Sequence, residues 1–417
     1  MNGAAAKQST IDGVSVQEGV AIVGHALDYW TGFVADLDGF QTFMEEHDNI
    51  LRAVKMGLGA ETTRRQALEL ALAAFLPVQN SGLWPAWIPL YEAIYGRFCD
   101  IDRTLHARFL SRLGQLYRLH NRVAEATAVH QEAAALIEPL PNNSQITCEI
   151  SFQLAEDYRQ QSQFNQAKAH GLTAWESAQT AQQSNAWQAT AANSLGLIHQ
   201  SLEQLDEAVD WYTKAIDLWR PLPRPVELGR VLSNLGITLQ GQGKLDEALL
   251  TYHQAQRQLE NTPLWLEKLI VQYNIAVVYF YQEAYALGES ILREAYATIA
   301  RQPDIHFTLY AHICHSLGNM ILRQKRYTEA ESPFREAIAA WQKLGDNLNL
   351  AESLGALAKA LIGQEQVKGA CGLYDQALAA VASLRHIPRG DQLYQELQEA
   401  RVALDYRHDV LGNQRAF

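Results

Sequence analysis

Residues 195–199 read Leu-Gly-Leu-Ile-His, and Gly196 is followed at fixed distances by Ala208, Tyr212 and Ala215. The order is a small residue, a second small residue twelve positions later, an aromatic residue four later and an alanine three after that. The same order recurs in two further stretches: Gly236, Ala248, Tyr252, Ala255 and Gly318, Ala330, Phe334, Ala337. Two antiparallel helices approach closely where their facing side chains are small. The pattern therefore predicts a repeated helical hairpin, with the aromatic residues filling the gap to the neighbouring hairpin.

Small residues occupy the first position of this pattern at intervals of 40 to 42 residues: Gly114, Ala155, Gly196, Gly236, Ala276, Gly318 and Ala358. Ala or Gly also stands twelve and nineteen residues after each of these anchors. A degenerate eighth copy lies upstream, at Ala74, Ala86 and Ala93. A single hairpin cannot bury its apolar face, so stacked copies have to form the core. We therefore expect an all-α fold, a right-handed α-solenoid (superhelix) of about eight hairpins over residues 61–388.

The segments on either side of the repeats lack the pattern. Residues 1–16 are small, polar and without period, so we expect a disordered lead. Residues 17–60 carry apolar positions three or four apart in two stretches, which predicts an N-terminal helical module that covers the first hairpin. Residues 389–417 begin with an amphipathic stretch, which predicts a C-terminal capping helix and a tail.

Composition limits the partners and the location of the chain. Hydrophobic residues make up 48% of the 417 residues, and the formal net charge of −12 opposes binding to a polyanion, so nucleic acid is not an expected partner. The apolar runs are shorter than the roughly 18 residues of a membrane span, and the first residues do not resemble a signal peptide. Cys99, Cys148, Cys314 and Cys371 are isolated in the sequence, as is typical of thiols in a reducing compartment. We therefore expect a cytoplasmic protein without a membrane partner.

The spacing and residue types resemble tetratricopeptide repeats, helical hairpins whose usual length is about 34 residues. The resemblance covers residues 65–385. The longer period of 40–42 residues is similar to that of kinesin light chains, of bacterial peptide-sensing regulators of the Rap type, and of the sensor arms of STAND signalling ATPases. The resemblance implies that a protein or peptide ligand binds in the concave groove of the superhelix.

A second resemblance concerns residues 46–54, which read Glu-His-Asp-Asn-Ile-Leu-Arg-Ala-Val. They resemble the helix that follows the nucleotide-binding module of STAND ATPases related to bacterial transcriptional activators, with Ile50-Leu51 in place of a single leucine. The sequence contains no GxxxxGK[ST] phosphate loop. The resemblance therefore implies that a nucleotide-binding ATPase module would be a partner or a separate part of a longer chain.

Motifs that would indicate chemistry are weak. Residues 241–244, Gly-Gln-Gly-Lys, imitate part of a phosphate loop but lie between two expected helices, where they fit a repeat turn. His312 and His315 could face one metal ion beside His306 and Cys314, yet no further ligand stands at a suitable spacing, which favours packing or groove histidines. Motifs of hydrolases and metalloproteases do not occur. We expect no metal, no cofactor and no enzymatic activity.

Groove positions follow from the repeat register. In peptide-binding tetratricopeptide proteins the first helix of each hairpin lines the groove, and an Asn two residues before the anchor, as at Asn234 and Asn274, bonds the ligand backbone through an amide that both donates and accepts. Tyr273 and Phe280 would contact an apolar side chain of the ligand. The candidate groove residues are Asn193, Asn234, Ile237, Gln240, Tyr273, Asn274, Val277, Phe280, Tyr281, His315, Asn319 and Arg323. The alternative is that the asparagines bond within their own turns and that Phe280 and Tyr281 are covered by the next hairpin.

These observations predict a non-enzymatic protein- or peptide-binding module. Its sharper form is the ligand-sensing or scaffolding arm of a bacterial STAND-type signalling system. Two alternatives stay open: a Rap-like peptide-responsive regulator of a partner enzyme, and a purely structural assembly scaffold.

Overall fold

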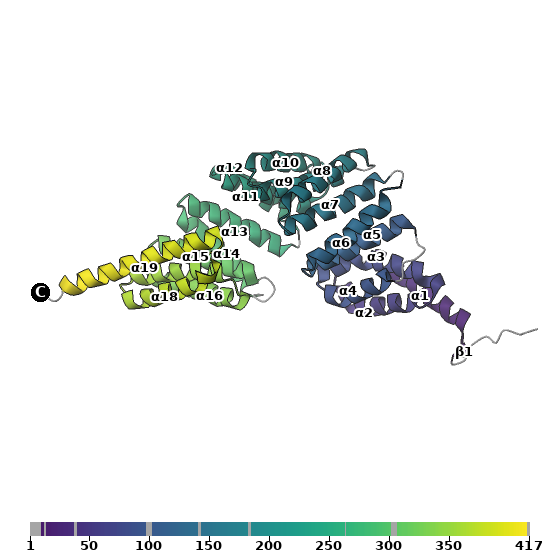
Figure 1. The fold of residues 1–417 in the computed structure, drawn as a ribbon, viewed down its shortest axis with the longest axis horizontal. Helices are drawn as coiled ribbons and strands as arrows, with labels where there is room; N and C mark the ends of the chain where they lie inside the picture. Colours follow the sequence, from purple (N-terminus) through teal and green to yellow (C-terminus); the bar gives the residue numbers. More distant parts are fainter. Residues whose placement is uncertain are drawn as a thin grey trace, which may run out of the picture. The chain divides into compact units, whose positions relative to one another are not determined.

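The computed structural model describes residues 10–11, 14–36, 40–96, 102–140, 143–181, 185–262, 264–301 and 307–414. Most of the expected disordered lead, together with Cys99 and His306, lies outside these residues. A two-residue antiparallel pair, β1 (Thr10–Ile11) and β2 (Val14–Ser15), precedes the first helix. Helices and their turns make up the rest of the described chain (Figure 1). Contacts divide the chain into two compact units, Met1–Leu222 and Pro223–Phe417.

In the described part of the first unit, a helical pair and a short 3₁₀ turn precede four hairpins. The pair is α1 (Val16–Ala35) and α2 (Phe40–Gly57), and the turn is η1 (Glu61–Thr63). The hairpins are α3 (Arg64–Ser81) with α4 (Trp84–Tyr95), α5 (Arg103–Leu119) with α6 (Val123–Ile137), α7 (Ser144–Gln160) with α8 (Phe164–Thr180), and α9 (Asn185–Ser201) with α10 (Leu205–Trp219). Helices α1 and α2 both pack against α3.

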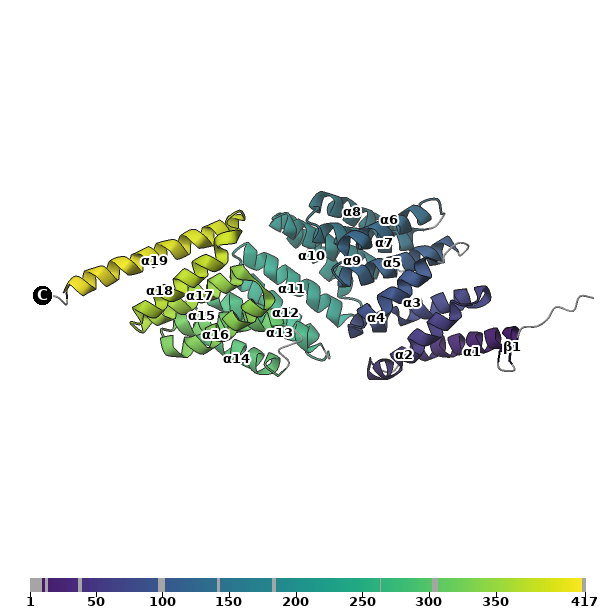
Figure 2. The same cartoon turned by 60° about the horizontal axis from the view of Figure 1, so that its bottom comes forward.

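The described part of the second unit also holds four hairpins, followed by a long final helix (Figure 2). The hairpins are α11 (Pro225–Gly241) with α12 (Leu245–Leu259), α13 (Trp265–Tyr281) with α14 (Tyr285–Ile299), α15 (Phe307–Arg323) with α16 (Tyr327–Leu344), and α17 (Asn347–Gly363) with α18 (Val367–Val381). A 3₁₀ turn, η2 (Ala382–Leu384), leads into α19 (Pro388–Gln414).

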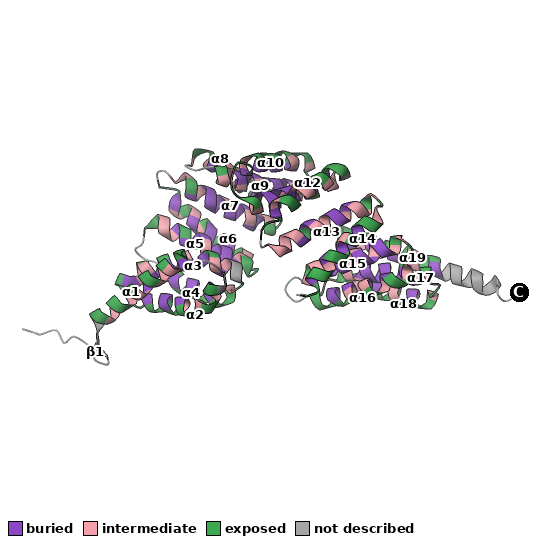
Figure 3. Ribbon diagram, turned by 180° about the vertical axis from the view of Figure 1, so that it is seen from behind, coloured by how far each residue is buried: buried purple, intermediate pink, exposed green. Residues whose placement is uncertain are grey.

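Each unit is a stack of hairpins, so the predicted all-α helical solenoid is confirmed. The second helix of one hairpin packs against the first helix of the next, as α12 does against α13 and α14 against α15. First helices also lie beside each other, in the rows α5, α7, α9 and α11, α13, α15, α17. Most helices therefore have a buried side and an exposed side (Figure 3).

The repeated small residue is explained by a ring that packs on it. A Cβ atom on Gly196 would lie 2.5 Å from the buried ring of Tyr212, sixteen residues later in the same hairpin. Gly236 stands in the same relation to Tyr252, at 2.5 Å, and Gly318 to Phe334, at 2.7 Å. Each of these three contacts lies within one hairpin, and the expectation that the rings also fill the gap to the neighbouring hairpin stays a prediction. Each ring covers the glycine of its own hairpin because the missing side chain leaves room for it there.

The turn inside each of the last seven hairpins contains one left-handed residue, seven positions after the anchor. These residues have φ between 58° and 75° and are Asn121, Ser162, Glu203, Gly243, Glu283, Lys325 and Glu365. At Gly243 the next amide, of Lys244, donates to the Leu239 carbonyl at 2.9 Å and closes the helix end. A left-handed conformation costs other residues more than glycine, so most of these turns are locally strained.

Replacing Glu283 with glycine should therefore stabilise the second unit. Glu283 is exposed and has φ 59°. The gain in the folded state exceeds the extra chain entropy of glycine in the unfolded state, which leaves a net gain of about 0.5–1 kcal/mol. Urea denaturation followed by circular dichroism measures it. The reverse change at the equivalent position, Gly243→Glu, should cost a similar amount, and a loss of stability in Glu283→Gly would contradict the argument.

The final helix closes the second unit through an apolar stripe. Leu393, Leu397 and Leu404 of α19 are buried against α17 and α18, where they join Leu354 and Val381. The helix continues to Gln414, beyond the end near residue 406 that the amphipathic pattern indicates. Within the described residues, none of the helices has the length and apolar composition needed to cross a bilayer.

Candidate functional site

Eleven of the twelve predicted groove residues belong to the second unit. Three adjacent first helices carry them: Asn234, Ile237 and Gln240 on α11, Tyr273, Asn274, Val277, Phe280 and Tyr281 on α13, and His315, Asn319 and Arg323 on α15. The register argument thus selects residues on one row of helices. Asn193 lies half-buried on α9 of the first unit. The candidate site therefore belongs to the second unit.

A hollow of about 240 Å³ opens between α11 and α13. Its wall contains Asn234 and is otherwise formed by Gly229, Arg230, Ser233, Leu259, Leu266, Glu267, Ile270 and Val271. Leu259 comes from the end of α12 and packs against Gly229, where a Cβ atom would lie 2.8 Å from its Cγ. The hollow is thus largely apolar, with a polar rim that includes the Asn234 amide.

The α13 residues of this hollow were missed by the sequence prediction. Ile270 stands six residues before its anchor, and Glu267 nine before, whereas the predicted groove residues lie between three before and five after their anchors. Ile270 is 37% exposed, which is unusual for an isoleucine in a packed helix. Ile270, an apolar residue about one helical turn before the predicted positions, was the sequence signal that could have located this hollow.

Polar contacts join α11 to α13 at the hollow. The Arg230 guanidinium lies 2.6 Å from the Glu267 carboxylate. The Asn274 amide donates to the Ser233 hydroxyl at 3.5 Å, a long bond that links the two helices. Asn274 therefore bonds the neighbouring hairpin and not its own turn, while the hydroxyl of Thr238 donates to the backbone carbonyl of Asn234 at 3.0 Å.

An aromatic cluster lies at the other end of α13. The ring of Phe280 packs edge-on against Tyr281 and Tyr285, with centroids 5.9 and 5.7 Å away, and the Arg323 guanidinium lies 5.5 Å from its centre. Tyr281 is 59% exposed, and Phe280 and Val277 are half-buried. The next hairpin leaves Tyr281 accessible, so the alternative in which it is covered does not hold for this residue. On α11, Ile237 is 41% exposed and Gln240 accepts a 3.5 Å bond from the Tyr252 hydroxyl.

His315 and Asn319 form a network between α15 and α17. His315 Nδ1 lies 2.8 Å from the Ser353 hydroxyl, and the Asn319 amide lies 2.9 Å from Nε2. Burial lowers the pKa of His315 to about 4, with a smaller contribution from His312, so the imidazole is neutral near pH 7. Both ring nitrogens are already bonded within the protein. The contacts of His315 thus stabilise the stacking of two hairpins.

The predicted histidine cluster is dispersed by packing. His312 lies against the Trp341 ring, at 4.8 Å, and the Tyr273 ring, at 6.0 Å. Burial raises the pKa of the Cys314 thiol to about 12. Among the described residues, no three His, Cys, Asp or Glu side chains are grouped to hold a metal ion.

Comparison with known families identifies the hairpins. A model of the tetratricopeptide repeat matches residues 187–261 and 307–383. These two segments therefore match the tetratricopeptide repeat, which confirms the resemblance predicted from the anchor spacing. A search of curated proteins finds no match to this chain.

Several solved structures have a similar fold. The apo form of the quorum sensor NprR from B. thuringiensis aligns with a TM-score of 0.58 and 14% identity over 86% of this chain and 99% of that one. Aspartyl phosphate phosphatase F from Bacillus subtilis aligns with a TM-score of 0.54 and 12% identity over 94% and 97%. A Rap protein complexed with competence and sporulation factor aligns with a TM-score of 0.53 and 12% identity over 81% and 99%. At these identities the likeness concerns the fold alone.

Proposed function

We propose that this chain of tetratricopeptide repeats binds an extended polypeptide segment along α11, α13 and α15 of its second unit and catalyses no reaction. The observation that carries the proposal is the hollow between α11 and α13, which combines apolar walls with the Asn234 amide. A void of about 150 Å³ accepts a benzene ring, so a hollow of about 240 Å³ has room for a leucine or phenylalanine side chain. The Asn234 side chain lines this hollow and is a polar group of the kind that contacts a peptide backbone.

Exposed apolar residues extend this surface along the row. Ile237 on α11 and Tyr281 on α13 both remain accessible, and Arg323 on α15 stacks over Phe280. Aromatic and arginine side chains are frequent anchors in protein interfaces. The ligand would place one side chain in the hollow and another against Phe280 and Tyr281.

We also propose the kind of signalling system to which this binding belongs. Similarity of fold to a quorum sensor and to a Rap protein in complex with a factor supports ligand binding that controls a partner protein. The Rap-like form is favoured over a purely structural scaffold because these structures align over more than four fifths of the chain. A STAND-type ATPase partner rests on residues 46–54 of α2, and a cytoplasmic location rests on the isolated cysteines.

The test is selection of a ligand followed by mutation of the row. Dodecamer peptides displayed on phage are selected against the full chain, and the dissociation constant of the tightest peptide is measured by fluorescence anisotropy. Ile237→Ser and Asn234→Ala should each weaken binding about tenfold, which corresponds to about 1.4 kcal/mol.

Leu250→Ser is the matched control. Leu250 is 59% exposed on α12, in the same hairpin as Ile237 but on its other helix. It should leave the dissociation constant unchanged, and circular dichroism should show equal helicity for all variants. If Leu250→Ser and Ile237→Ser weaken binding equally, the row of first helices is not the binding surface.

A further inference from the structure

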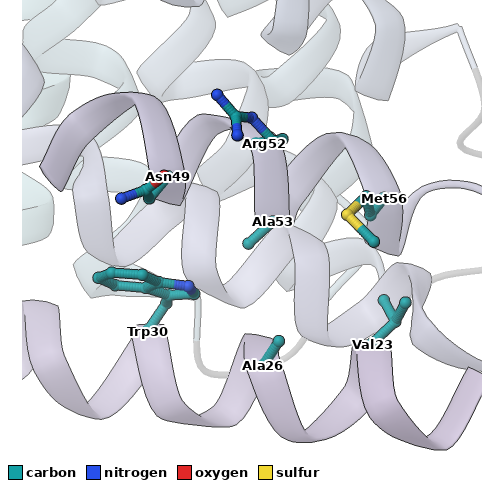
Figure 4. Close-up of a pocket in the computed structure, with 7 residues that line it drawn as sticks. All are labelled: Val23, Ala26, Trp30, Asn49, Arg52, Ala53 and Met56. Atoms are coloured by element: carbon teal, nitrogen blue, oxygen red, sulfur yellow. The ribbon is translucent and has the colours of Figure 1, made fainter.

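A second hollow, of about 200 Å³, lies between α1 and α2 in the first unit (Figure 4). It is lined by Val23, Ala26 and Trp30 of α1 and by Asn49, Arg52, Ala53 and Met56 of α2. Ala26 and Ala53 are too small to fill the space between the two helices. Trp30 stands at one end, and Val23 and Met56 face each other at the other end (Figure 4). The result is a short, mostly apolar hollow between the two helices.

Arg52 is the charged residue of its lining, and its charge is unpaired in the part of the chain that the structure describes. The two nearest acidic side chains on α2 have other partners. Glu46 accepts a bond from the Asn49 amide at 2.7 Å, and Asp48 lies 3.5 Å from His47. The side chain of Arg52 is exposed, so its five donors are available to an external acceptor.

The shape limits what can occupy the hollow. Asn49 and Met56 are seven residues apart on one helix, which spans about 10 Å. A docked helix would have only about two turns in contact over that length, and the volume exceeds the roughly 150 Å³ that holds a benzene ring. One ring or a short branched chain fits. A carboxylate matches the unpaired guanidinium in charge and can form two parallel bonds with it.

We infer that the α1–α2 hollow binds a free monocarboxylic acid with a single aromatic ring or a short apolar body. The body lies against Trp30, Ala26 and Ala53, and the carboxylate meets Arg52. The site uses residues of the first unit alone, so it is independent of the polypeptide-binding row on α11, α13 and α15.

The probe is 3-phenylpropionate, with 3-phenylpropan-1-ol as its uncharged counterpart. Binding to the full chain is followed by NMR of the tryptophan indole signals, with the Trp30 signal assigned from Trp30→Phe. A ligand of about ten heavy atoms should bind with a dissociation constant on the order of 1 mM. The alcohol should bind at least about tenfold more weakly because it lacks the charge that pairs with Arg52.

Two variants separate the two parts of the inference. Arg52→Gln should weaken binding of the acid about tenfold without affecting the alcohol. Ala26→Leu should fill the hollow and abolish binding of both probes. Lys55→Gln removes another exposed cation of α2 that does not line the hollow, so binding should be unchanged. Circular dichroism confirms that each variant is folded.

The inference is overturned if neither probe binds at about 10 mM, if acid and alcohol bind equally, or if Arg52→Gln and Lys55→Gln have the same effect. Light scattering adds one further outcome. A dimer of the wild type that Ala26→Leu converts to a monomer would show that a second copy of the chain occupies the hollow, which also overturns it.

Discussion

Replacing Asp157 with alanine is expected to destabilise the first unit by about 3–5 kcal/mol, because the largely buried Arg118 guanidinium and the buried His130 ring lose this carboxylate as a partner. Asp157 lies on α7 and is fully buried. Its Oδ1 accepts a bond from the Arg118 guanidinium of α5 at 2.8 Å, and its Oδ2 lies 2.5 Å from His130 Nδ1 of α6. The other ring nitrogen of His130 lies 3.1 Å from the Ser111 carbonyl. One carboxylate thus joins three helices of two consecutive hairpins.

Urea denaturation of the full chain, followed by circular dichroism, measures this loss. Asp157→Asn keeps the shape of the side chain but removes its charge, so it should cost less than Asp157→Ala. Asp210→Ala is the surface control, since Asp210 is exposed on α10 of the same unit and should change stability by at most about 0.5 kcal/mol. A loss below about 1 kcal/mol in Asp157→Ala would show that the network contributes little.

Replacing Gly196 with valine is the second large effect, with an expected cost of about 3 kcal/mol. A Cβ atom there would lie 2.5 Å from one ring carbon of Tyr212 and 2.6 Å from another. Tyr212 is fully buried, and its hydroxyl donates to Gln200 at 2.9 Å, so the ring is held on both sides. The two helices of the hairpin would have to separate to admit the new side chain.

The control is the same substitution at an open glycine. A Cβ atom on Gly32, on α1 of the same unit, would have no neighbour within 4 Å, so Gly32→Val should be nearly neutral. A double-mutant cycle tests whether the Tyr212 ring causes this loss of stability. In a Tyr212→Ala background the cost of Gly196→Val should fall, because the ring is gone. Equal costs in both backgrounds would show that Tyr212 is not the obstacle.

The fold could be predicted from the sequence because close helix packing leaves few choices at a contact point. Gly196, Gly236 and Gly318 are small because a ring of the partner helix lies on each of them. Spacing alone therefore locates the hairpins. It does not mark the division after Leu222, since the interval from Gly196 to Gly236 equals that from Gly236 to Ala276. The three prolines in residues 221–225 were the available signal.

The candidate site could be predicted in part. The register placed eleven residues on adjacent helices of one unit, and their binding role stays a prediction. The hollow between α11 and α13 could not be located in this way, because it depends on how Leu259, Ile270 and Val271 pack around it. Spacing also does not distinguish a side chain that faces a ligand from one that bonds a neighbouring hairpin, as His315 does with Ser353.

Hydrogen bonds between consecutive hairpins have a consequence for how such a chain can change over evolution. Arg118 and Asp157 are 39 residues apart, and two other bonded pairs, Ser194 with Glu156 and His315 with Ser353, are each 38 apart. These separations are close to one repeat period. A duplicated segment of one period brings its own donor and acceptor at the spacing that its neighbours require. Whole hairpins can therefore be gained or lost with most contacts restored, whereas an insertion of a few residues within a hairpin changes the spacing of the bonded pairs that span it.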